Sequence, residues 1–254
     1  MLGQILRASG VKAEEVGNIG TPITRAIDSD AEVFAVELSS FQLHTARTVR
    51  PLASVCLNVD ADHLDWHGSV EAYAADKARV YENTVRACVY PASDRRVEAM
   101  VEDADVVEGA RAIGLTLGAP SVSQFGIVEG LLVDRAFVDD RARHALALAH
   151  VSDLAEAFGP HPSPAVLSDA LAASALARAY GVEPEAVEAG SSFLPSRGAP
   201  TRRRCPRRGP DLDRRLEGDQ RARGPSLPVG AAPAQRDLDR RRRWLGIRYR
   251  IRRS

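Results

Sequence analysis

Residues 58–65 have the sequence Asn-Val-Asp-Ala-Asp-His-Leu-Asp (NVDADHLD) and directly follow an apolar run at residues 53–57. The apolar run predicts a strand, and three aspartates and His63 crowd into the turn after it. Open α/β sheets bind ligands beyond the carboxyl ends of their strands, so this turn predicts a metal-and-phosphate site. Asp and Asn are also common in ordinary turns, where they bond to the local backbone, so a plain loop is the alternative.

A second predicted strand ends in a similar way. Residues 32–38 (EVFAVEL) form an apolar run with Glu37 near its end. A carboxylate in such a place is costly unless it is paired or binds a cation. Ser39 follows and is expected to cap a helix that contains Gln42. Two strand ends of this kind favour the ligand site over the plain loop.

Lys77 lies on a predicted helix at residues 69 to about 83. It shares one face of that helix, at spacings of three and four, with Val70, Tyr73, Ala74, Val80 and Tyr81. Lysine is an unusual choice in this chain, because only Lys12 and Lys77 are lysines among the 34 basic residues. A lysine that buries its stem and exposes its amine would explain the position without a function. The same face also points to the crevice expected to hold His63 and Glu37, so Lys77 is a candidate site residue.

Strands and helices alternate along the first 192 residues. Further helices are predicted at residues 1–9, 163–180 and 184–189, a strand at 87–90, and short strands and hairpins at 106–137. Residues 17–22 (GNIGTP) are expected to form a turn. This alternation predicts one α/β domain over residues 1–192, with a doubly wound, mostly parallel sheet.

Charge divides the chain into two unlike parts. Of the 254 residues, 44% are hydrophobic and 27% charged, which is typical of a soluble protein. Residues 1–201 contain 16 basic and 28 acidic residues, a net charge of −12, whereas residues 202–254 contain 18 arginines and 6 acidic residues, a net charge of +12.

Cysteines and hydropathy indicate a cytoplasmic protein. Cys56, Cys88 and Cys205 are too few and too scattered for a disulfide framework or a zinc site. No apolar run approaches the roughly 20 residues that span a bilayer, and no signal peptide precedes the first strand. We therefore expect neither a membrane segment nor secretion.

Four motifs together resemble a known family. They are GNIGTP at 17–22, VELSSFQL at 36–43, NVDADHLDWH at 58–67 and YAADKARVY at 73–81. In order and spacing they are similar to the central ATPase-like domain of the Mur ligases, and four motifs in register are far more specific than one. The SSFQL form is similar to the members that join D-glutamate to UDP-N-acetylmuramoyl-L-alanine. The resemblance covers roughly residues 1–193.

The resemblance implies a monomeric, ATP-dependent ligase of peptidoglycan precursor synthesis. ATP would phosphorylate the carboxylate of UDP-N-acetylmuramoyl-L-alanine, and the amine of D-glutamate would attack the acyl phosphate. Mg²⁺ would offset the phosphate charge. By resemblance, Glu37 and His63 hold Mg²⁺, and Lys77 is carbamylated by CO₂, which turns a cation into an oxygen-bearing anion.

The resemblance also implies substrate contacts. Asn18, Ser39 and Gln42 match positions that hold the muramoyl substrate, and Asp169 is similar in place to a position that contacts adenine. Catalysis would then rest on positioning and electrostatics, without an enzyme nucleophile.

The sequence departs from the family at both ends. No GxxxxGK[ST] phosphate-binding loop occurs, and the family's amino-terminal domain is missing, so Met1 is expected to be an internal methionine and the chain alone to be inactive. Codons allowed for residues 211–227, read one base later, encode TWIDDSKATNAHAARL, which contains the family's DDSKATN-like motif. The same shift gives an Ala-His-Arg string at 198–200 and SVTWIAGGGGL at 235–245. We therefore expect residues 193–254 to be a disordered, out-of-frame tail.

Two other functions stay open. An arginine-rich segment could bind nucleic acid through phosphate contacts. Apart from Trp244 and Tyr249 it lacks interleaved aromatic residues, and a frameshift in GC-rich DNA produces arginine by default, so nucleic acid is the less favoured partner. The domain could also be a non-catalytic remnant that keeps part of a nucleotide-sugar crevice.

Overall fold

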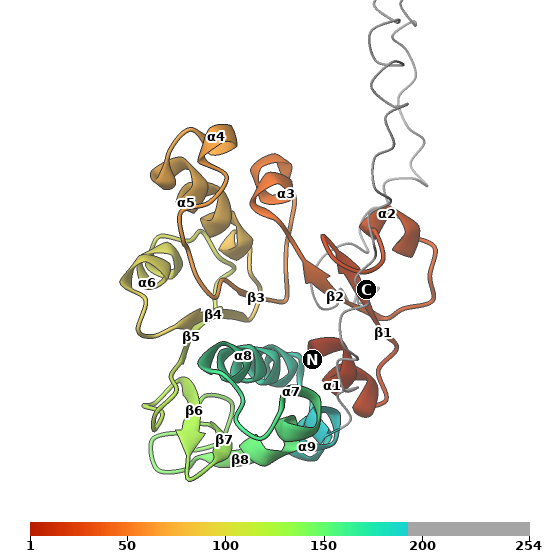
Figure 1. Ribbon diagram of the computed structural model, residues 1–254, viewed down its shortest axis with the longest axis vertical. Coiled ribbons are helices and arrows are strands. Elements are labelled where there is room, and N and C mark those ends of the chain that lie inside the picture. Colours follow the sequence, from red (N-terminus) through yellow and green to blue (C-terminus); the bar gives the residue numbers. More distant parts are fainter. Residues whose placement is uncertain (193–254) are drawn as a thin grey trace, which may run out of the picture.

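The computed structural model describes residues 1–192, and the segment predicted as an out-of-frame tail, residues 193–254, lies outside the described residues. Within residues 1–192, helices alternate with mostly parallel strands (Figure 1), so the predicted α/β class is confirmed. No helix in this part of the chain is both long and apolar enough to cross a membrane.

The strands form two sheets where one was predicted. β1 (Ala13–Gly17) and β2 (Val33–Glu37) pair in parallel with each other. The other six strands form a second sheet in the order β3-β4-β5-β6-β7-β8, parallel from β3 to β6 and antiparallel from β6 to β8. Their bounds are β3 (Ala53–Val55), β4 (Ala87–Pro91), β5 (Arg111–Leu115), β6 (Gln124–Val128), β7 (Leu131–Asp134) and β8 (Leu146–His150).

The change of direction after β6 has a local cause. β6 and β7 are joined by a two-residue turn, Glu129-Gly130. Both residues have positive φ, 50° and 77°. Such turns match the twist of antiparallel strands, and two residues are too few to carry the chain back for a parallel pairing. The predicted hairpin in this region is confirmed.

Most helices are short. They are α1 (Leu2–Ala8), α2 (Ile23–Ala26), α3 (Ser40–Thr45), α4 (Leu64–His67), α5 (Val70–Ala78), α6 (Arg95–Glu102), α7 (Ala155–Phe158), α8 (Pro164–Tyr180) and α9 (Pro184–Ser192), with the 3₁₀ turns η1 (Arg79–Tyr81) and η2 (Val151–Leu154). The long helix α8 follows its sequence signals closely. The Ser163 side chain accepts the N–H of Val166, and Gly181 ends the helix in the left-handed region, with a φ of 105°.

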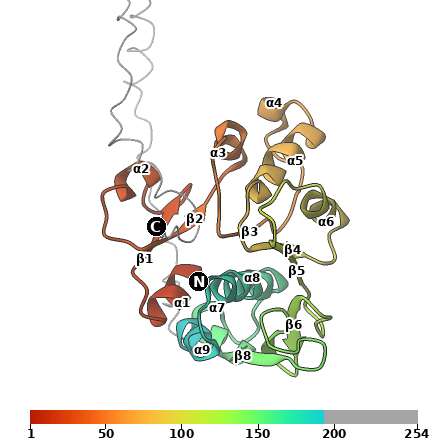
Figure 2. The ribbon, with the colours of Figure 1, turned by 180° about the vertical axis from the view of Figure 1, so that it is seen from behind.

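Helices cover both faces of the larger sheet. Side chains alternate along β4, where Ala87 and Val89 belong to the main hydrophobic cluster with residues of α8, and Cys88 belongs to a second cluster with Val97 and Met100 of α6. Figures 1 and 2 show α8 on one side of the strands, with α5 and α6 on the other. The doubly wound arrangement therefore holds for this sheet.

The two sheets share one core through α1 and α8. Val33 of β2 and Ala53 of β3 belong to the same cluster, together with the buried residues Ile5 and Leu6 of α1. α1 packs against both α8 and α9, and α1 and α8 lie side by side in both views (Figures 1 and 2). A β-carbon on Gly190 would lie 2.5 Å from the α-carbon of Ile5, so α1 and α9 cross closely.

Some boundaries differ from the prediction. The strand expected from the apolar run at 53–57 ends at Val55, because the N–H of Cys56 donates to the hydroxyl of Tyr81 over 3.0 Å instead of continuing the ladder. The helix expected at residues 69 to about 83 is α5 followed by the 3₁₀ turn η1. β1 and β8 were not predicted.

Candidate functional site

The carboxyl ends of β1 and β2 lie side by side. Gly17 stands opposite Glu37, and the backbone N–H of Asn18 donates to the carbonyl oxygen of Glu37 over 2.8 Å. A β-carbon on Gly17 would lie 2.0 Å from that oxygen, and the φ of Gly17 is +127°. Both constraints call for glycine. The structure thus brings the predicted site residues Asn18 and Glu37 together, and both are exposed.

Ser39 and Gln42 meet at the start of α3. The Ser39 hydroxyl accepts the N–H of Gln42 over 3.3 Å, and Oε1 of Gln42 accepts the N–H of Ser39 over 2.8 Å. This reciprocal capping stabilises the helix by itself. The pair therefore has a structural role, and it also lies just beyond the end of β2.

His63 lies beside α3. It precedes α4 in the left-handed conformation, with φ 50° and ψ 35°. The centre of its ring is 4.9 Å from the centre of the Phe41 ring, and Phe41 belongs to α3. Its Nε2 is 3.4 Å from Oδ2 of Asp62, and the side chain is half exposed. His63 is therefore accessible and borders the helix that carries Gln42.

Lys77 is directed toward the end of β3. Its Nζ lies 5.5 Å from the centre of the Tyr73 ring, and the residue is half-buried. Burial raises the pKa of the Cys56 thiol, and the Lys77 ammonium opposes that rise. Cys56 is the first residue after β3, so the lysine charge acts on a group at that strand end.

Of the three residues predicted to share a metal, His63 and Lys77 border one aromatic cluster, and none of the three bonds directly to another. Among the described residues, no hydrogen bond or ion pair joins Glu37, His63 and Lys77 directly. Ring contacts connect Lys77 to His63 through Tyr73, His67 and Phe41, with centres 5.2 Å apart from Tyr73 to His67 and 5.4 Å apart from His67 to Phe41.

Glu37, His63 and Lys77 could hold a metal ion only together with groups of the substrate. Within residues 1–192, no three His, Cys, Asp or Glu side chains converge to hold an ion. Mg²⁺ usually keeps several waters and takes one or two carboxylates plus substrate phosphates. The exposed Glu37 carboxylate fits that pattern and a carbamate on Lys77 would add oxygen ligands, whereas His63 would contribute a nitrogen, a less usual ligand for this ion. The residues therefore fit Mg²⁺ as part of a substrate complex and do not form an all-protein cage.

Asp169, the predicted adenine contact, lies on α8 and is exposed.

A polar network next to α4 was not predicted from the sequence. The His67 side chain is fully buried, and its Nδ1 lies 2.8 Å from Oδ2 of Asp76, while its Nε2 lies 3.0 Å from Oγ of Ser40. The other Asp76 oxygen lies 2.8 Å from Nδ1 of His44. The partners are separated by 9, 27 and 32 residues, so no local pattern announces them. The one available signal is that His67 follows His63 by about one helical turn.

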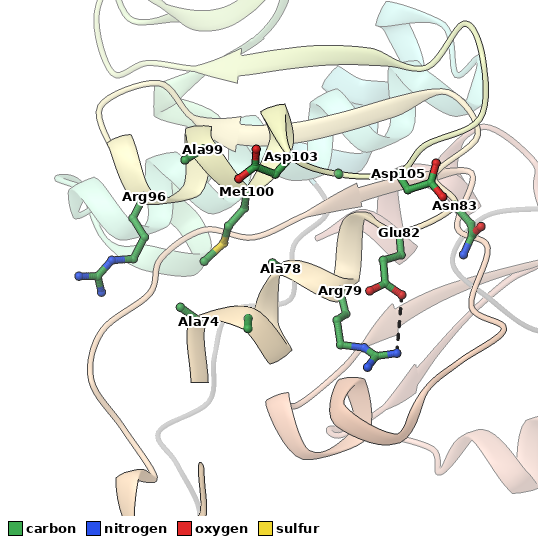
Figure 3. A pocket seen from close by; sticks show the side chains of 12 residues that line it. Ala74, Ala78, Arg79, Glu82, Asn83, Arg96, Ala99, Met100, Asp103 and Asp105 are labelled. Carbon is green, nitrogen blue, oxygen red and sulfur yellow. Dashed lines mark ion pairs between the residues drawn. The ribbon is translucent and has the colours of Figure 1, made fainter. Parts of the chain in front are cut away.

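A cavity of about 560 Å³ lies elsewhere, between α5, η1 and α6. Figure 3 shows an alanine-rich wall with Met100, edged by charged side chains. Arg79 is turned to Glu82, with 3.6 Å between Nη2 and Oε2, and Arg96 points away from both (Figure 3). None of the predicted site residues lines this cavity.

Comparisons with known proteins agree with the motifs. The Mur ligase middle domain matches residues 4–118. The chain is 53% identical over 198 residues to a UDP-N-acetylmuramoylalanine–D-glutamate ligase of Streptomyces coelicolor, covering 77% of this chain and 41% of the relative. It is 51% identical over 192 residues to the ligase of the same name from Streptomyces avermitilis (75% and 40%) and 51% over 189 residues to that of Leifsonia xyli (71% and 36%).

This chain thus spans about two fifths of the length of these relatives. The match includes the ends of β1 and β2, α3, the His63 turn and α5, which are the elements that form the site described above. On its motifs, its fold and these similarities, the chain carries the middle domain of the Mur ligase family.

Proposed function

We propose that this chain supplies the strand-end site of a cytoplasmic, ATP-dependent ligase that adds D-glutamate to UDP-N-acetylmuramoyl-L-alanine in peptidoglycan precursor synthesis. The observation that most supports this proposal is the backbone hydrogen bond between Asn18 and Glu37 at the ends of β1 and β2, with Ser39 and Gln42 just beyond it. The names of the similar relatives support the choice of substrates.

The substrate roles follow from exposure and chemistry. Asn18, Ser39 and Gln42 offer amide and hydroxyl groups for the muramoyl substrate. Because two of the three also cap α3, substrate binding would use a rigid element rather than a mobile loop. Holding the phosphorylated carboxylate near the amine of D-glutamate would supply much of the rate by proximity.

The ionic roles belong to Glu37, His63 and Lys77. They would hold Mg²⁺ together with ATP phosphates, and the ion would offset the phosphate charge when bound. Lys77 as a carbamate would present oxygen atoms from α5, whereas its free ammonium would repel the ion. Asp169 is proposed as an adenine contact on sequence resemblance alone.

Binding is the direct test, because residues 1–254 contain no GxxxxGK[ST] motif for turnover. Calorimetry should show that the chain binds UDP-N-acetylmuramoyl-L-alanine, and Asn18→Ala should weaken binding about tenfold through a lost hydrogen bond. Glu37→Gln should weaken Mg·ATP binding, whereas Glu71→Gln, an exposed glutamate on α5, should not. Equal effects of Glu37→Gln and Glu71→Gln would count against the ionic site.

A chimera tests the reaction itself. Residues 1–192 would replace the matching segment of the Streptomyces coelicolor relative, to which the chain is 53% identical. We expect D-glutamate-dependent release of ADP from the chimera, and loss of that activity with Lys77→Ala. A folded chimera that binds substrate but never turns over would refute the assignment.

A further inference from the structure

We propose that His67 is a positioning residue, which holds the turn carrying His63 against α3 and α5. The inference rests on the proposed function for its catalytic meaning, and on the hydrogen-bond geometry for its structural content. His67 would not touch substrate. It would fix the distance between the groups that do.

The turn that carries His63 has little stability of its own. α4 has four residues, which is a single helical turn, and a helix that short is not stable without outside contacts. His63 lies in the left-handed region, which costs a non-glycine residue about 1 kcal/mol. Leu64 and Trp66 are 40% and 50% exposed. The turn therefore needs an anchor.

His67 is that anchor. Its side chain is fully buried, unlike those of its neighbours on α4. Phe41 stacks on the ring at 5.4 Å, and Trp66 and Tyr73 meet it edge-on at 4.5 Å and 5.2 Å. The backbone N–H of His67 donates to the carbonyl oxygen of His63 over 3.0 Å. Fixing His67 consequently fixes His63.

The polar contacts of His67 reach both neighbouring helices. Asp76 precedes Lys77 on α5, and Ser40 follows Ser39 on α3. His44, also on α3, holds the second oxygen of Asp76. The His67 imidazole thus connects α3, α4 and α5, which carry or adjoin proposed site residues.

Histidine suits this place because the two partners differ in chemistry. The Asp76 carboxylate accepts only, so Nδ1–H donates to it, and Nε2 bonds to the Ser40 hydroxyl, which can serve as donor or acceptor. A neutral imidazole offers one donor and one acceptor. Loss of the two His67 hydrogen bonds would leave the buried Ser40 hydroxyl without this partner and Asp76 with His44 alone, which is costly.

A nucleophilic role for the same groups is not supported. Hydroxyl, imidazole and carboxylate also occur in this order in hydrolases. Ser40, however, is only 8% exposed, and its hydroxyl bonds to the fully buried His67 side chain, so a substrate has little access to its oxygen. The geometry therefore favours a positioning role for these groups over a nucleophilic one.

The test compares three variants of the full chain. His67→Phe keeps the ring and removes both hydrogen bonds. His67→Asn restores an N–H close to the position of Nδ1, within reach of Asp76. His144→Phe changes a histidine that is 71% exposed and serves as the matched control. Amide exchange by NMR, urea unfolding and calorimetry with Mg·ATP are measured for each.

We expect His67→Phe to speed exchange of the amides of Trp66 and His67 about tenfold beyond the change in global stability, and to raise the Kd for Mg·ATP about tenfold. His67→Asn should recover most of both changes, and His144→Phe should change neither. Unchanged exchange in His67→Phe, or no recovery in His67→Asn, would overturn the inference. If the wild-type chain did not bind Mg·ATP, the proposed function would fail while the exchange data still decided the role of His67.

Discussion

Replacing Gly17 with alanine is expected to separate the ends of β1 and β2. The new β-carbon would lie 2.0 Å from the carbonyl oxygen of Glu37, and the nearest atoms all belong to the backbone of that residue. Backbone atoms cannot rotate out of the way as the end of a long side chain can. The strands must therefore move apart, and the 2.8 Å hydrogen bond from Asn18 to Glu37 must lengthen.

The magnitude follows from three contributions. An alanine at positive φ costs about 1 kcal/mol, forced overpacking about 2 kcal/mol, and a lost hydrogen bond about 1 kcal/mol. We expect the free energy of unfolding to fall by about 4 kcal/mol, a large part of the stability of a typical domain. Gly10→Ala is the matched control, because Gly10 has a φ of +81° but no atom within 4 Å of the added carbon. It should lose only about 1 kcal/mol.

Urea unfolding of both variants measures the difference, and calorimetry with UDP-N-acetylmuramoyl-L-alanine measures the effect on the site. Gly17→Ala should weaken substrate binding more than Gly10→Ala does, since only the former displaces Asn18. If the two variants lost the same stability, the close approach of Gly17 to Glu37 would be refuted.

Three further perturbations test the packing and the buried groups. Arg178→Met should lower the free energy of unfolding in urea by about 4 kcal/mol, because it leaves the fully buried carboxylate of Asp134 without the Nε donor at 3.0 Å. If the free energy of unfolding fell by less than it does for a surface substitution, the ion pair would be contradicted. Gly190→Ala should lower the free energy of unfolding by about 2 kcal/mol in the same assay, because its β-carbon would lie 2.5 Å from the α-carbon of Ile5. An unchanged urea midpoint would show that α1 and α9 cross less closely. Burial raises the pKa of the Cys56 thiol above its ordinary value of 9.0, so its stabilising contribution is complete below about pH 9 and is lost as the pH rises toward the folded-state pKa. Unfolding in urea between about pH 7 and 10 should show that decline, and Cys56→Ala should make it shallower.

Local signals predicted much of the fold. Ser39 and Ser163 mark helix starts because their hydroxyl groups bond to free backbone N–H groups of the first turn. Gly181 marks a helix end because it adopts positive φ without a steric cost. β1 was missed because Glu14 and Glu15 interrupt its apolar pattern.

The candidate site could be predicted in part. Glu37 and His63 follow apolar strands, and the carboxyl ends of such strands collect ligand groups, so their location could be inferred from order along the chain. The network of His67, Asp76 and Ser40 could not, because its members belong to three separate motifs and only the fold brings their side chains together. The role of Gly17 was also hidden, since its constraint comes from the backbone of another strand.

By itself, the sequence determined the alternation of strands and helices, the position of the caps and turns, and the family. Each of these depends on residues that are neighbours in the chain or on motifs in a fixed order. Only the tertiary structure decided that β1 and β2 form a sheet apart from β3, that a series of aromatic rings lies between Lys77 and His63, and that the His67 side chain is buried. These features arise from packing between elements, where the distance between side chains is set by the shared core of α1 and α8 and not by their separation in sequence.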